Sequence, residues 1–204
     1  MLSNAAANLV CDDPPALANF DIRKMEGIWY EQQHTFSQHE KNINCSVSQL
    51  YDMQTDADDA SLVSYKVYGS FQTEVLGHWT PRAGMNSKGK CGTDGLCYIS
   101  YFGKSVPEPN LTMVDTDYTS YSIEYSCDKD QGVNMLWLLT RDQNPTDDFF
   151  AEITAKAKKL LPNFDWTTLD KRVYQGEHCS AVKPRTAGDG FFAGVEDHLA
   201  EFTQ

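Results

Sequence analysis

The chain has 204 residues and a mass of 23.0 kDa, which fits one domain, because all-β barrels commonly reach this length as a single unit. Hydrophobic residues make up 41% and charged residues 23% of the chain, and this balance excludes a disordered acidic protein. The formal net charge of -12 repels phosphate backbones and anionic lipid headgroups, so we expect no nucleic-acid partner.

Cysteine usage indicates an oxidising compartment. The six cysteines form no CxxC motif, and HExxH and His-x3-His zinc patterns are absent, so disulfides are the better interpretation. We therefore expect a secreted, extracellular protein without its signal peptide. The sequon Asn110-Leu111-Thr112 predicts a glycan on Asn110. Asn44-Cys45-Ser46 also matches the sequon, although a half-cystine in the middle makes its use less favourable.

Eight segments between residues 27 and 141 alternate Tyr, Val, Ile, Thr or Trp with polar residues, as strands do. Short connections such as Gly69-Ser70 make neighbours antiparallel hairpins. The Gly/Lys-rich region 81–96 predicts a loop. It contains GxxxxGK, but Cys91 stands where a phosphate-binding loop needs Ser or Thr, so we do not expect a phosphate-binding loop here. The predicted strands are 27–36, 46–53, 61–68, 71–80, 97–103, 109–116, 118–126 and 133–140.

One helix follows the strands, over about residues 146–161. Thr146 can cap it, and apolar residues recur at helical spacing until Pro162. Closing eight sequential strands removes the open edges of the sheet, so the pattern predicts an all-β, eight-stranded antiparallel up-and-down barrel with this helix packed outside. We expect an N-terminal arm at 1–19, the barrel at 20–180 and a tail at 181–204, whose residues 192–202 suit a short amphipathic helix or a frayed end.

Three separated motifs resemble the lipocalin signature. They are GIWYEQQ at the first strand, TDYTSYSIEYSC between the sixth and seventh strands, and LWLLTRD at the end of the eighth. Their order and spacing, with the helix after the last strand, are similar to lipocalins over about residues 20–180. The segments YSIEYSC and GEHC resemble most the group of apolipoprotein D, retinol-binding, insect bilin-binding and crustacyanin proteins.

The resemblance implies roles for the motif residues. Trp29, after Gly27, would close the barrel floor with Arg141 packed across it, a cation–π contact worth about 0.5–2 kcal/mol. Asp117 and Tyr118 would organise the turn between the sixth and seventh strands. The implied disulfides are Cys11–Cys127 and Cys45–Cys179, with Cys91 and Cys97 left to each other; the sequence alone leaves 15 connectivities open.

Alternation from Trp29 and Arg141 gives a set of residues that should line the cavity. Trp137 is the foremost, because an indole offers a large apolar face and an N–H donor. A bulge would shift these assignments by one residue. The ligand-binding candidates are Glu31, Gln33, Ser122, Glu124, Met135, Trp137 and Leu139, with Tyr51, Tyr65, His78 and Tyr101 from the middle strands.

The internal carboxyls Glu31 and Glu124 leave alternatives open. Each must be paired, hydrogen-bonded or protonated, because burying a charge costs several kcal/mol. A carboxylate pair could select a cationic amine, as amine-binding lipocalins do, and it disfavours the two propionates of a bilin. The alternative without a ligand contact is a buried glutamate that is hydrogen-bonded by a neighbouring side chain or by water.

The favoured function is a secreted, non-enzymatic carrier of a lipophilic small molecule. A carotenoid or bilin chromophore is the first expectation for the ligand, followed by a retinoid, sterol or fatty acid. A lipocalin-fold enzyme is the alternative of another class, with Glu124 as general acid, since paired cysteines supply no thiol nucleophile. A second copy of the chain and a cell-surface receptor are further expected partners.

Overall fold

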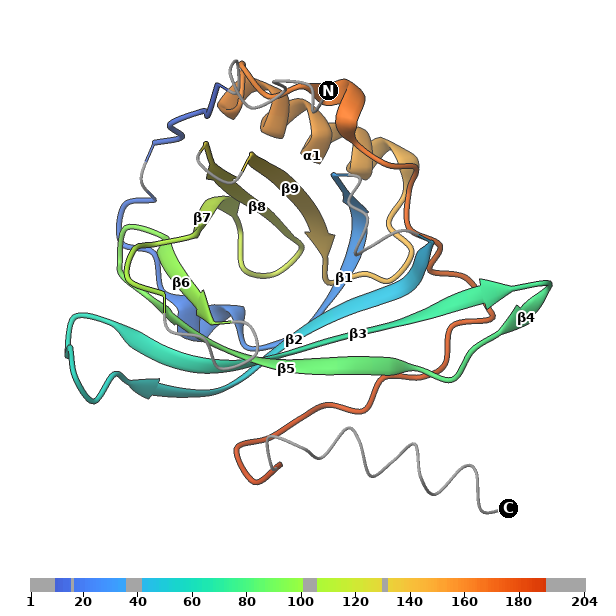
Figure 1. The fold of residues 1–204 in the computed structure, drawn as a ribbon, viewed down its shortest axis with the longest axis horizontal. Coiled ribbons are helices and arrows are strands. Elements are labelled where there is room, and N and C mark those ends of the chain that lie inside the picture. Colours follow the sequence, from blue (N-terminus) through green and yellow to red (C-terminus); the bar gives the residue numbers. More distant parts are fainter. Residues whose placement is uncertain (1–9, 16, 36–41, 101–105, 130–131, 190–204) are drawn as a thin grey trace, which may run out of the picture.

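The structure is a computed structural model that describes residues 10–15, 17–35, 42–100, 106–129 and 132–189. Its strands form one antiparallel sheet in the order β2-β1-β9-β8-β7-β6-β5-β3-β4, and pairing of β2 with β3 closes eight of them into a barrel (Figure 1). The expected fold class is confirmed. The strands are β1 (Gly27–His34), β2 (Ile43–Thr55), β3 (Val63–Val75), β4 (His78–Trp79), β5 (Ala83–Cys91), β6 (Leu96–Ser100), β7 (Leu111–Thr116), β8 (Tyr121–Asp128) and β9 (Val133–Thr140).

The third predicted strand, 61–68, lies within β3, but its predicted end and the position of the fourth barrel strand were wrong. Residues 61–80 do not fold into a hairpin at Gly69-Ser70; β3 runs straight through that dipeptide, and the next barrel strand is β5, inside the predicted loop 81–96. The glycines that suggested a loop have a packing role. A Cβ on Gly89 would lie 2.4 Å from the Tyr65 ring, and a Cβ on Gly84 2.3 Å from the Tyr68 ring, so both tyrosines lie across glycine backbone.

Strand β4 belongs to a hairpin that projects past the barrel (Figure 1). It pairs with the end of β3, Glu74 opposite Trp79, through a turn in which Leu76 and Gly77 both have positive φ, 53° and 80°. This geometry suits a two-residue hairpin turn. His78, a predicted cavity residue, is therefore exposed on the hairpin and lies outside the barrel.

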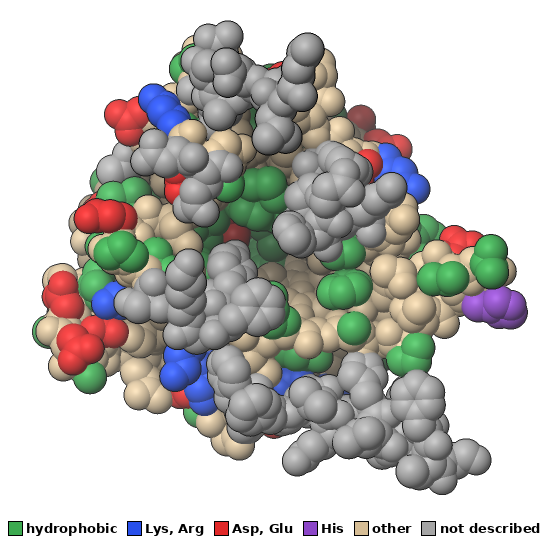
Figure 2. All heavy atoms as spheres, viewed as in Figure 1, with side chains coloured by type: hydrophobic (Ala, Val, Ile, Leu, Met, Phe, Trp, Pro, Cys, Tyr) green, Lys and Arg blue, Asp and Glu red, His purple; other side chains and the backbone are tan. Residues whose placement is uncertain are grey.

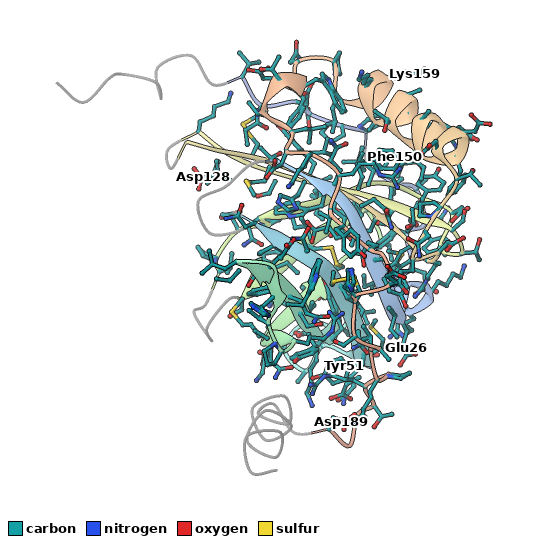
Figure 3. All side chains as sticks on the ribbon, turned by 90° about the vertical axis from the view of Figure 1, so that its right-hand side faces the viewer. Glu26, Tyr51, Asp128, Phe150, Lys159 and Asp189 are labelled. Carbon is teal, nitrogen blue, oxygen red and sulfur yellow. A yellow bond between two sulfur atoms is a disulfide. The ribbon has the colours of Figure 1, made fainter. Side chains whose placement is uncertain are left out.

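Helix α1 (Asp147–Leu160) covers the outer face of β7 and β8. The Thr146 hydroxyl accepts a hydrogen bond from the Phe149 N–H, which caps the helix start. Phe150, labelled in Figure 3, is on this helix. The buried layer beneath it contains Ile153 and Ala157 of the helix and Tyr121, Ile123, Tyr125, Leu136 and Leu138 of the sheet.

The two ends of the described chain are attached to the outside of the barrel. Cys11–Cys127 holds the N-terminal arm, and Cys45–Cys179 holds residues 163–189, which we call the strap. The third disulfide, Cys91–Cys97, joins residues that face each other across β5 and β6. All three expected pairs are present. The amphipathic helix predicted at 192–202 lies outside the described residues, in which no helix is long and apolar enough to cross a membrane.

Candidate functional site: the barrel interior

The floor of the barrel is made by an indole and a guanidinium. Trp29 is fully buried, and its ring centroid lies 3.8 Å from the guanidinium carbon of Arg141. Trp29 Nε1–H donates to the carbonyl of Met25 (2.8 Å) in the short helix η2 (Ile22–Met25). Arg141 donates to the carbonyls of Ile28 and Glu26, at 2.9 Å each. The arginine thus binds backbone that precedes and enters β1, which closes this end.

The turn between β7 and β8 supports the floor. The Asp117 carboxylate accepts hydrogen bonds from the backbone N–H groups of Thr119 (2.9 Å) and Ser120 (2.7 Å). Tyr118 has a positive φ of 67°, and its hydroxyl accepts a hydrogen bond from the Asp21 N–H (3.2 Å). Gly27 has a φ of 105°, and a Cβ there would lie 3.1 Å from Arg141 Nη1. The close approach of the arginine therefore favours glycine at this position.

Four inward side chains form a row across adjacent strands above the floor. Strand register sets Met113 opposite Glu124, Glu124 opposite Trp137, and Trp137 opposite His34. Facing Cβ atoms in such ladders are about 4.5–5.5 Å apart. The row below it contains Thr116, Ser122, Leu139 and Glu31.

A β-bulge in β1 decides which residue enters the upper row. Glu31 pairs with Leu139, but the next pair is Gln33 with Leu138, so Gln32 is the extra residue. The bulge reverses the alternation. His34 faces inward, whereas Gln33 faces outward and donates to the carbonyl of Asp170 in the strap (2.7 Å). The inward orientation expected for Gln33 is therefore wrong.

Glu31 is held by its own neighbours. The Ser46 hydroxyl donates to its Oε2 (2.7 Å), and His34 Nδ1 is hydrogen-bonded to its Oε1. Glu124 has less support, since its one described hydrogen bond comes from the Ser122 hydroxyl (3.3 Å). Burial deep in the barrel raises the pKa of Glu124 to about 7; the Ser122 hydrogen bond opposes this rise, and the charge of Glu31 adds to it. Glu124 is thus a carboxyl that titrates near neutral pH.

The upper interior is open. The inward side chains Trp137 and Met135 are only partly buried. Their outward neighbours on β9, Leu136 and Leu138, are fully buried. Gly69 also faces inward, and a Cβ there would meet nothing within 4 Å. Figure 2 shows this face of the molecule hollowed at its centre, with hydrophobic and acidic side chains inside. The described residues contain no cluster of three or more His, Cys, Asp or Glu side chains suited to a metal ion.

Comparison with solved structures identifies this architecture. Insecticyanin from the tobacco hornworm Manduca sexta superimposes with a TM-score of 0.60 at 18% identity, covering 87% of this chain and 91% of that chain. Lobster apocrustacyanin A1 gives 0.55 at 17% identity, covering 88% and 96%. The chain has the lipocalin fold. The resemblance drawn from the three motifs is thereby confirmed.

Sequence relatives of this lipocalin barrel are distant. No protein-family model matches the chain. It is 28% identical to Triafestin-2 of Triatoma infestans over 130 residues, which span 57% of each chain. It is 22% identical to the Lazarillo protein of Schistocerca americana over 184 residues, covering 88% of this chain and 82% of the relative.

The structure separates the remaining candidates for the lipocalin cavity. Glu31, Ser122, Glu124, Met135, Trp137 and Leu139 face inward. Tyr65 does too, with its hydroxyl 3.2 Å from Cys91 Sγ. Tyr51 points outward: its neighbour Leu50 packs in the core with Trp29, and the Tyr51 hydroxyl donates to Asn86 Oδ1 (3.1 Å). Figure 3 shows Tyr51 on the same side of the molecule as Asp189, a residue of the strap. Tyr101 lies outside the described residues.

Two interior residues escaped the sequence reasoning. Neither His34, which is 2% exposed, nor Ser46 was among the predicted cavity residues. The bulge moved His34 inward, and no local signal marks a bulge in the run GIWYEQQH. The polar residues spaced around Glu31 could have suggested that a buried carboxylate would draw donors toward itself.

Proposed function

We propose that this lipocalin is a secreted carrier that takes one lipophilic small molecule into the barrel without transforming it. The observation that supports this proposal most strongly is the inward row that contains Trp137. In that row the Trp137 indole and the titratable carboxyl of Glu124 face open space below the barrel mouth. Burial of apolar ligand surface would drive binding at about 25 cal/mol per Å². The three disulfides support an oxidising, extracellular location.

A chromophore, a carotenoid before a bilin, is our first proposal for the ligand. The inward positions of the described strands include no lysine or arginine, and two carboxyls are present, so a dianionic ligand would meet repulsion. A long neutral polyene meets none. A retinoid, a sterol or a protonated fatty acid satisfies the same conditions.

The proposal is tested by titrating the purified protein with β-carotene, biliverdin, retinol and a fatty acid while following tryptophan fluorescence. At least one ligand should quench saturably, and Trp137→Phe should remove most of the quenching. Trp166→Phe is the matched control, because Trp166 packs outside the barrel against Phe164, with ring centroids 5.1 Å apart. Absence of saturable binding across the set contradicts the carrier. An absorption spectrum and solvent extract of protein from its natural source would name the ligand.

A lipophilic amine is the second candidate, favoured by Glu124 itself. An ammonium group between Glu124 and Trp137 would receive a carboxylate and the face of an indole. Amine binding would then ionise Glu124 and release a proton near pH 7. In calorimetry with dodecylamine, Glu124→Gln should weaken binding roughly 10- to 100-fold, the loss of one charged hydrogen bond. Equal affinities of the variant and wild type would eliminate this candidate.

We propose no catalysis, because all six cysteines are in disulfides and supply no thiol nucleophile. The inward acid–base groups described above are Glu124, whose pKa burial raises to about 7, and the hydrogen-bonded pair of His34 and Glu31. Steady product formation from a bound lipid would overturn this part of the proposal. A second copy of the chain and a cell-surface receptor remain proposed partners. Light scattering with and without residues 185–204 tests the first, and pull-down from cell membranes tests the second.

A further inference from the structure

Two N-glycosylation sequons differ in what their asparagine side chains do. In Asn110-Leu111-Thr112, the Asn110 amide pairs with the backbone of Ile99 at both ends. Oδ1 accepts from the Ile99 N–H (2.7 Å), and Nδ2–H donates to the Ile99 carbonyl (3.0 Å). Two parallel hydrogen bonds to one residue require the Nδ2 hydrogen on the same side as Oδ1.

That hydrogen is the one a glycan would replace. A secondary amide is planar and trans, so the carbon attached to nitrogen lies on the side of the oxygen and the remaining hydrogen lies opposite. A sugar on Asn110 would therefore occupy the place of the hydrogen bonded to Ile99. The folded barrel gives Asn110 a structural role at the end of β6 and argues against the glycan expected there.

The Asn44 amide, unlike that of Asn110, does not bond one backbone residue at both its oxygen and its nitrogen. It lies on the outer face of β2, opposite Gln72, and its side chain is partly exposed. Its Oδ1 accepts from the N–H of Tyr174 (3.3 Å), a contact that uses no amide hydrogen and survives glycosylation. Its Nδ2 makes one long, exposed hydrogen bond, 3.4 Å to the carbonyl of Asn42. The nitrogen that would carry the sugar is thus weakly held at the surface.

The Asn44 side chain opens onto a groove of about 460 Å³ between the strap and the β3–β4 hairpin. This volume is in the range of sites that hold a small ligand. The rings of Trp79 and Tyr174 are 5.0 Å apart, and His178 stacks 5.5 Å from Trp79. The groove is lined by Asn44, Glu74, Gly77, Trp79, Lys171, Tyr174 and His178.

We propose that Asn44 carries an N-linked glycan and that its first sugars lie in this groove. The inference rests on the proposed secretion. Aromatic faces offer apolar surface to the C–H face of a sugar ring, while Glu74 and Lys171 can hydrogen-bond its hydroxyls. The Cys45–Cys179 disulfide fixes the strap beside Asn44, which keeps the groove formed.

The test is secretion of the full chain from insect cells behind a supplied signal peptide, followed by intact-mass measurement and glycopeptide mapping. The supplied peptide forces entry into the secretory pathway, so a missing glycan counts against this inference and leaves the carrier proposal, read by ligand titration, untouched. Wild type should carry one N-glycan, on Asn44. Asn44→Gln should carry none, and Thr112→Ala should carry the wild-type glycan.

Thr112→Ala is the matched control because it removes the second sequon and leaves the Asn110 amide in place. An unglycosylated wild type, or a glycan that survives Asn44→Gln, overturns the proposal. Should Asn44→Gln not be secreted, Ser46→Thr keeps the sequon and Ser46→Ala removes it, so only the first should be glycosylated.

A second measurement locates the sugars. Diethylpyrocarbonate should modify His178, whose side chain is 54% exposed in the protein alone, faster after enzymatic removal of the glycan than before it. Equal rates in the two forms would show that the sugars do not lie in the groove.

Discussion

Glu124→Gln tests the electrostatics of the barrel interior. The folded protein binds the Glu124 proton more tightly than the unfolded chain does, since burial raises the pKa from 4.5 to about 7. Stability from this group is therefore fully present below pH 4.5 and is lost as pH rises through about 7. At about 1.36 kcal/mol per pKa unit, the loss reaches about 3 kcal/mol. Glutamine keeps the shape and cannot ionise, so it removes the loss.

The assay is urea unfolding of wild type and variant, disulfides intact, from pH 4 to 8.5. The two proteins should have equal stability near pH 4. Glu124→Gln should become more stable by about 3 kcal/mol at pH 8, which corresponds to roughly 6–12 °C in Tm for a chain of this size. Glu152→Gln, at an exposed site on α1, is the matched control and should show no such divergence. A stability difference that does not change with pH would refute the reasoning.

Three further predictions concern the floor, the wall and the crosslinks. A lysine at position 141 cannot donate to the carbonyls of both Ile28 and Glu26 while stacking on Trp29, so Arg141→Lys should lower the free energy of unfolding in urea by about 2–4 kcal/mol. A near-native urea midpoint would contradict the stabilising role of the floor. Gly89→Ala should cost about 1–3 kcal/mol, because its Cβ meets the Tyr65 ring, whereas Gly69→Ala should stay within about 0.5 kcal/mol; equal effects would contradict the packing. Replacing both Cys11 and Cys127 with Ala should cost about 4–5 kcal/mol, given the 116-residue separation; an unchanged Tm would contradict this.

The barrel could be predicted from the sequence because most strands alternate cleanly, and the motifs at Trp29, Asp117 and Arg141 fixed its order. The misplaced fourth strand has a physical cause. Gly84 and Gly89 lower strand propensity, but they are needed where Tyr68 and Tyr65 lie flat across the neighbouring backbone. A cross-strand contact of this kind leaves no local pattern.

The interior was predictable where alternation is uninterrupted, as for Trp137 and Glu124 on β9 and β8. The interior residues of β1 beyond the bulge at Gln32 were not predictable, because the bulge turns His34 inward in place of Gln33. The wrong orientation of Tyr51 has a related cause, because its placement depended on a neighbour, Leu50, whose direction only the pairing with Val67 reveals. Side-chain direction follows register, and register is a property of two strands together.

The most direct test of the account fills the hollow. Gly69→Leu places a large side chain where the wall opens, so the same fluorescence titration should show binding by wild type and at least about tenfold weaker binding by the variant, with circular dichroism unchanged. Undiminished binding by a folded Gly69→Leu protein would contradict the claim that the ligand lies inside the barrel.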